Sequence, residues 1–90
     1  MTEQLPQIEW EKDAKSKYDD MISRIPLFHR EIAKQIVDKK AVENAVSRQA
    51  KQVEEEDIIK AFYDEIPKAL YSMMVRLMET VGFDHKKYGY

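Results

Sequence analysis

Apolar side chains recur every three or four residues along most of the chain, the spacing of one face of an α-helix. The first stripe predicts a helix over residues 11–24. We find no sustained alternation of apolar and polar residues of the kind that marks a strand. The pattern therefore predicts an all-α protein, a small bundle of three to four short helices. The apolar positions of the first stripe are Trp10, Ala14, Tyr18, Met21, Ile22 and Ile25.

A proline separates the first stripe from the second. Proline fits the first turn of a helix and disrupts a helix interior, so Pro26 predicts a tight corner before a second helix over residues 27–52. Phe28 is expected to pack at this corner or to contact a partner, and Trp10 to join the core or to bind. Arg30 lies on another face, as a solvated cation or as a carboxylate contact on a docking surface.

The second helix is predicted to carry a charged pair in the middle of its apolar face. At about 100° per residue, Lys39 and Glu43 fall within that face, and their spacing lets them pair with each other. Three interpretations stay open: structural pairing, a helix break that exposes both, or a functional polar site. The apolar face comprises Phe28, Ile32, Ile36, Val42, Val46, Ala50 and Val53, and a small-residue flank comprises Ala33, Val37, Ala41 and Ala45.

The C-terminal half predicts two further helices. Four consecutive acids at residues 54–57 suit the start of a third helix over about residues 55–63, because the N-terminus of a helix is its positive end. A fourth helix with Pro67 in its first turn ends near Gly82, a favourable helix terminator. Its apolar residues cover much of its girth, so they form core or a partner interface. They are Leu70, Met73, Met74, Leu77, Met78 and Val81.

Length and composition narrow the function. Ninety residues, 43% of them hydrophobic, suit one domain, predicted at residues 10–82 between a loose leader (1–9) and a short tail (83–90). The net charge of −2 argues against nucleic-acid binding. The chain has no cysteine, so it lacks thiolate chemistry. We expect no catalytic residues, cofactor, metal site or membrane insertion, and a cytoplasmic location.

Several short motifs together resemble one known family. They are Trp10, Ala14, the run Ile25-Pro26-Leu27-Phe28-His29-Arg30, Val42-Glu43-Asn44-Ala45, Val53, and Glu56-Asp57-Ile58-Ile59-Lys60-Ala61. Over residues 10–61 the set resembles the small helical domain at the C-terminus of one of the subunits of light-independent (dark-operative) protochlorophyllide reductase. Members of that family usually have a glycine shortly before the third helix, where this chain has residues 48–52 without one. The family domain is also commonly fused to a nitrogenase-like catalytic body, and none of its cluster ligands are present here.

The resemblance implies a non-enzymatic module associated with chlorophyll biosynthesis that docks to itself or to a protein partner. A tetrapyrrole-type ligand is a weaker alternative. A small histone-like nucleic-acid-binding protein is the alternative from another class, through a basic stripe of Lys34, Lys39, Lys40, Arg48 and Lys51. An enzyme that uses Glu43 and His29 is the least favoured. The predicted docking surface comprises Trp10, Phe28, Arg30, Met73, Met74, Leu77 and Met78.

Overall fold

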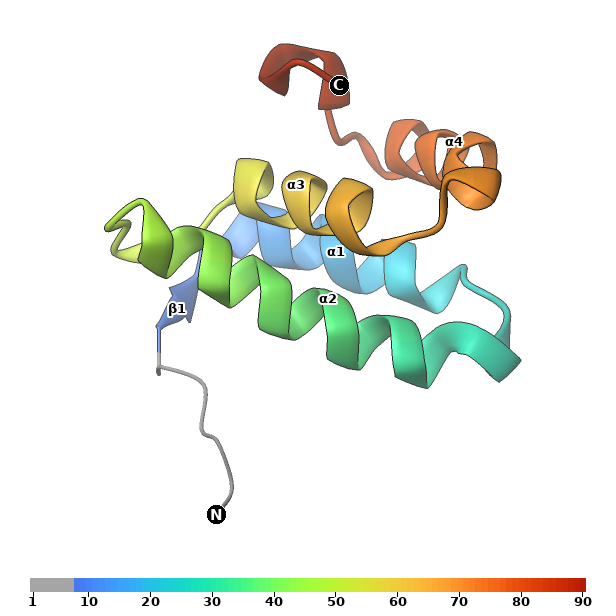
Figure 1. The fold of residues 1–90 in the computed structure, drawn as a ribbon, viewed down its shortest axis with the longest axis horizontal. Helices are drawn as coiled ribbons and strands as arrows, with labels where there is room; N and C mark the ends of the chain where they lie inside the picture. Colours follow the sequence, from blue (N-terminus) through green and yellow to red (C-terminus); the bar gives the residue numbers. More distant parts are fainter. Residues whose placement is uncertain (1–7) are drawn as a thin grey trace.

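The chain folds into four α-helices, and the all-α prediction is confirmed (Figure 1). This computed structural model describes residues 8–90, so most of the predicted leader lies outside the described part. The helices are α1 (Lys12–Ser23), α2 (Leu27–Ser47), α3 (Glu55–Glu65) and α4 (Tyr71–Val81). Two short 3-10 helices, Lys68–Leu70 and His85–Tyr88, precede and follow α4.

The corner between α1 and α2 forms where the proline predicts it. Pro26 directly precedes α2, which begins at Leu27. Arg30 reaches back across the corner: its Nη2 donates to the Ser23 carbonyl at 2.8 Å and its Nε to the Ile25 carbonyl at 3.2 Å. These carbonyls lie at the C-terminal end of α1, where a helix leaves acceptors unpaired. Arg30 therefore closes the corner, and its guanidinium is already engaged by the chain itself.

The second helix ends five residues earlier than predicted. It stops at Ser47, because Gln49 adopts a positive φ of 60°. The Ala50 amide then donates to the Ala45 carbonyl at 2.9 Å, and the Gln49 amide to the Val46 carbonyl at 3.0 Å. This pair of bonds is the Schellman arrangement that terminates helices, usually with glycine at the left-handed position. Here glutamine takes that position without the glycine, which is why the sequence pattern predicted a longer helix.

A short pair of strands follows this turn, and no sequence pattern predicted it. β1 (Glu9–Trp10) pairs in parallel with β2 (Gln52–Val53), with Trp10 level with Val53. The Glu11 amide extends the pairing with a bond of 2.8 Å to the Val53 carbonyl. Part of the predicted leader is therefore held in place, and it leads directly into α1.

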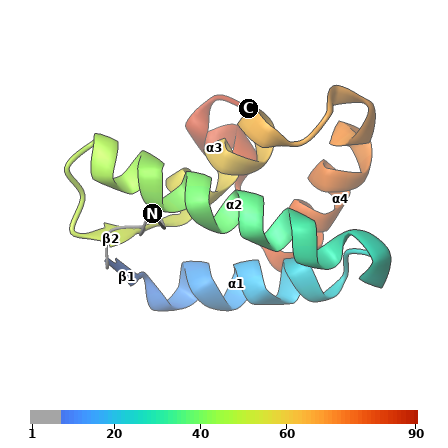
Figure 2. The ribbon, with the colours of Figure 1, turned by 60° about the horizontal axis from the view of Figure 1, so that its bottom comes forward.

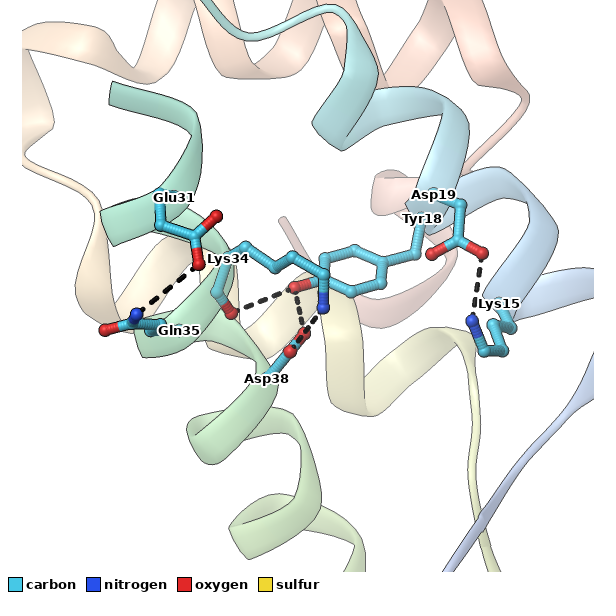
Figure 3. A network of polar contacts seen from close by, with 7 residues as sticks. All are labelled: Lys15, Tyr18, Asp19, Glu31, Lys34, Gln35 and Asp38. Atoms are coloured by element: carbon cyan, nitrogen blue, oxygen red, sulfur yellow. Dashed lines mark hydrogen bonds and ion pairs between the residues drawn. The ribbon is translucent and has the colours of Figure 1, made fainter. Parts of the chain in front are cut away.

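One tyrosine hydroxyl joins α1 to α2 (Figure 3). Tyr18 is buried, and its hydroxyl donates to the Asp38 carboxylate at 2.5 Å. Lys34 forms an ion pair with the other oxygen of the same carboxylate at 2.7 Å. On the other side of the core, the Tyr18 ring stacks on Trp10 at 5.3 Å and meets the edge of Phe62 at 5.9 Å. Trp10 is half-buried against the core rather than free to bind.

A buried ion pair fixes the start of α3 against the end of α2. Asp57 is only 2% exposed and receives two bonds from Arg48, at 2.8 and 2.7 Å. The same carboxylate accepts the Glu54 amide at 2.9 Å, so it also closes the first turn of α3. Its hydrogen bonds with Arg48 raise the pKa of that guanidinium. The acids at residues 54–57 are thus the helix start that the sequence predicts.

The last segment packs onto the helices instead of forming a free tail. Phe83 and His85 are both buried. Nδ1 of His85 lies 2.9 Å from the Tyr90 carbonyl, and the Tyr90 ring stacks on Tyr63 at 4.4 Å. The predicted fourth helix is also shorter than expected, because Pro67 opens a 3-10 turn and α4 begins only at Tyr71.

Candidate docking surface

The outward face of α2 exposes a row of large apolar side chains, which we name the α2 stripe: Phe28, Ile32, Ile36 and Val46. Their exposed fractions are 80%, 64%, 42% and 43%. The first three are spaced four residues apart, so they line one side of the helix. Leu27, at the first position of α2, is 77% exposed beside them. Figure 2 shows α2 crossing the front of the molecule with its outer side uncovered.

The opposite side of α2 forms the core contact. Val37, Ala41 and Ala45 are fully buried, and they come from what the sequence analysis treats as a flank. Small side chains let α2 approach its neighbours closely, which large side chains would prevent. The expectation that Phe28, Ile32 and Ile36 lie in the core is therefore wrong. The face predicted as buried is largely the face that the fold leaves outside, Val42 and Val53 excepted.

Lys39 and Glu43 lie within the α2 stripe, between Ile36 and Val46, and both are exposed. The prediction that they interrupt a buried apolar face is thus corrected: the face is solvent-exposed, and no helix break is needed to expose them. Among residues 8–90, neither forms an ion pair with the other or with any other side chain, and the same holds for Glu31. Other charges of α2 are engaged: Lys34 pairs with Asp38, and Arg48 binds Asp57.

The remaining predicted docking residues divide between core and surface. Met74 and Met78 are buried in the core, which removes them from any docking surface. Met73 is 41% exposed on α4, and Leu77 is half-buried against the core. Leu27, Ile32 and Ile36 are the exposed apolar residues that the predicted surface omits. Their helical spacing opposite a row of alanines was the signal that could have identified them.

A polar groove between α2 and α3 is the rival site. It has a volume of about 410 Å³ and combines charges of both signs. Most of them are already paired: Arg48 with Asp57, and Lys60 with Asp64 at 2.7 Å. These contacts account for the groove as the joint between two helices. Its lining residues are Lys40, Glu43, Asn44, Ser47, Arg48, Glu56, Asp57 and Lys60.

The predicted basic stripe is not a free row of cations. Two of its five members, Lys34 and Arg48, are held in ion pairs with carboxylates of the same chain. Within the part of the chain that the structure describes, we find no group of three or more metal-ligating side chains placed to hold an ion. No helix in residues 8–90 is both long enough and apolar enough to cross a bilayer.

Comparison with known proteins gives a family and no function. No curated protein and no solved structure matches the chain. Nothing in these comparisons links it to protochlorophyllide reductase, so that resemblance stays a prediction. A family model described as "Protein of unknown function (DUF2621)" matches residues 3–90. That match spans nearly the whole sequence, including the last segment beyond Gly82. The chain therefore belongs to the DUF2621 family.

Proposed function

We propose that this chain is a non-enzymatic interaction module that docks to protein through the α2 stripe. The observation that carries the proposal is the exposure of Phe28, Ile32 and Ile36 together on one helix face. Large apolar side chains scattered singly over a surface are ordinary, whereas an aligned row on one side of a helix marks a binding surface. Such a row is the form in which an amphipathic helix meets another helix or a groove.

The surroundings of the stripe support docking over catalysis. Its polar members, Lys39 and Glu43, are exposed on a convex helix face, whereas catalytic groups are usually held in a concave, water-excluding site. Aromatic and aliphatic anchors with charged side chains beside them are what a protein interface provides: an apolar centre with a polar rim. We place any link to tetrapyrrole reduction in a partner protein, as the resemblance implies.

Site-specific photo-crosslinking in the cell that makes this protein tests the proposal. The photoreactive residue p-benzoylphenylalanine replaces Gln35, which is exposed beside the stripe and leaves its apolar side chains intact. The control places the same residue at Ser16, exposed on α1. We expect discrete protein adducts from position 35 that are absent from position 16. Ile32→Glu in the same chain should abolish them.

The absence of adducts at position 35, or adducts that survive Ile32→Glu, would contradict docking through the stripe. Both variants change exposed residues only, so circular dichroism should show unchanged helix content in each. The mass of any adduct, by gel and peptide mass spectrometry, then identifies the class of partner.

A further inference from the structure

We propose that the partner on the α2 stripe is a second copy of this chain, whose α2 packs antiparallel to the first. The proposal rests on the docking function proposed above and specifies its partner. It comes from the pattern of charges around the stripe, because Glu31, Lys39 and Glu43 have no ion-pair partner within residues 8–90. The one side-chain contact of Glu31 there is a long hydrogen bond from Gln35, at 3.5 Å (Figure 3).

These charges are self-complementary in an antiparallel arrangement. Glu31 and Lys39 are eight residues apart, about 12 Å along the helix at about 1.5 Å per residue. When a two-fold axis passes level with Gln35, Glu31 of each copy lies level with Lys39 of the other. Two equivalent ion pairs then flank the seam, as an isologous interface requires.

The apolar side chains interleave in the same register. Ile36 of each copy falls about 1.5 Å from the axis and Ile32 about 4.5 Å from it, on the other side. Along the seam the four isoleucines therefore alternate between the two copies. Phe28 falls level with the space between Lys39 and Glu43 of the second copy, and Val46 lies further along the same face. Most of the stripe is thus used by one operation.

A parallel pair of α2 helices is disfavoured by the same charges. With the two helices in register, Glu31 would lie against Glu31 and Lys39 against Lys39. Like charges across an interface oppose association, so the charge pattern selects the antiparallel arrangement.

The size of the seam sets the expected affinity. A contact one helix wide buries less than about 1,200 Å² in total, the range of weak and transient interfaces. We therefore expect a dissociation constant on the order of 10–100 μM. Association should be visible across a concentration series and absent at high dilution.

Sedimentation equilibrium on the purified full chain, from about 1 μM to about 1 mM, tests the inference. We expect concentration-dependent dimers for the wild type and a monomer throughout for Ile32→Glu, which places a charge at the centre of the seam. Glu31→Lys alone and Lys39→Glu alone should each weaken dimerisation by about fivefold, the scale of exposed ion pairs. The double variant E31K/K39E should restore it. Ser16→Glu on α1 is the control and should change nothing.

A wild type that stays monomeric at about 1 mM would overturn the inference. A dimer that resists Ile32→Glu would also overturn it, since another surface would then carry the contact. A double variant that fails to recover would exclude the antiparallel register. In the crosslinking experiment, adducts of position 35 with a different protein uphold the docking function and refute the second copy. Adducts of twice the chain mass support both.

Discussion

Tyr18 shows how one hydroxyl can join two elements. It is buried, and its bond to Asp38 connects α1 to α2. Removing the hydroxyl with Tyr18→Phe leaves Asp38 paired with Lys34, so no charge is left without a partner. We expect the free energy of unfolding to fall by about 1–1.5 kcal/mol, measured by urea denaturation at neutral pH. Tyr88→Phe is the matched control and should change it by less than about 0.5 kcal/mol. Equal effects of the two substitutions would contradict this role.

The same residue predicts a loss of stability at high pH. Burial, reinforced by the hydrogen bond with Asp38, raises the pKa of Tyr18. The folded protein therefore holds this proton more tightly than the unfolded chain does. Its contribution is complete below pH about 10, the ordinary pKa of tyrosine, and is lost as the pH rises further. Denaturation between pH about 9 and about 11.5 should show a steeper decline for the wild type than for Tyr18→Phe. Identical slopes would argue against this coupling.

Gln49 is the residue that ends α2, and its backbone conformation destabilises the fold. Its φ of 60° lies in the left-handed region, which glycine adopts far more readily than a residue with a side chain. We expect Gln49→Gly to raise the free energy of unfolding by about 0.5–1 kcal/mol, measured by thermal and urea denaturation. The control is Gln52→Gly in β2, where glycine should destabilise. A lower stability for Gln49→Gly would show that its side chain has a role the backbone does not reveal.

At the scale of elements, the sequence predicted the helices better than their orientation. The apolar period located all four, and Pro26 located the corner. The same period could not decide which side of α2 is buried, because Val37, Ala41 and Ala45 repeat as regularly as Phe28, Ile32 and Ile36. That decision depends on how closely α1 and α3 approach, which is a property of the packed molecule. The candidate site was therefore only partly predictable: Phe28 was identified, while Ile32 and Ile36 were assigned to the core.

The methionines of α4 test the same distinction between faces. Met78 is fully buried, and Met73, in the preceding turn, is 41% exposed. Met78→Ala leaves a cavity in a packed core, so we expect a loss of about 2–4 kcal/mol in the free energy of unfolding. Met73→Ala, the matched control, should cost less than about 1 kcal/mol. Urea denaturation of the two variants measures the difference. Comparable losses would place both side chains in the core and contradict the observed orientation of α4.

At the scale of the whole molecule, the two ends of the described chain close the structure, and sequence could not foresee it. β1 and β2 have two residues each, which is too short to show a period. The last segment contributes Phe83 and His85 to the interior through a turn that begins after Gly82, whose φ of 93° suits glycine. These contacts join segments far apart in the sequence, so local patterns carry little information about them.

The last prediction concerns whether this final segment belongs to the cooperative unit. Phe83 is buried near the C-terminal end, whereas Trp10 stacks on Tyr18 in the layer of α1 and β1 (Figure 1). Phe83→Ala should lower the free energy of unfolding by about 3 kcal/mol through lost packing. If the domain unfolds in one step, tryptophan fluorescence and circular dichroism must report the same lowered midpoint, although Trp10 lies outside the segment. Tyr90→Ala, at an exposed ring, is the milder comparison. A fluorescence midpoint that stays at the wild-type value while the dichroism changes would make residues 83–90 an appendage that unfolds by itself.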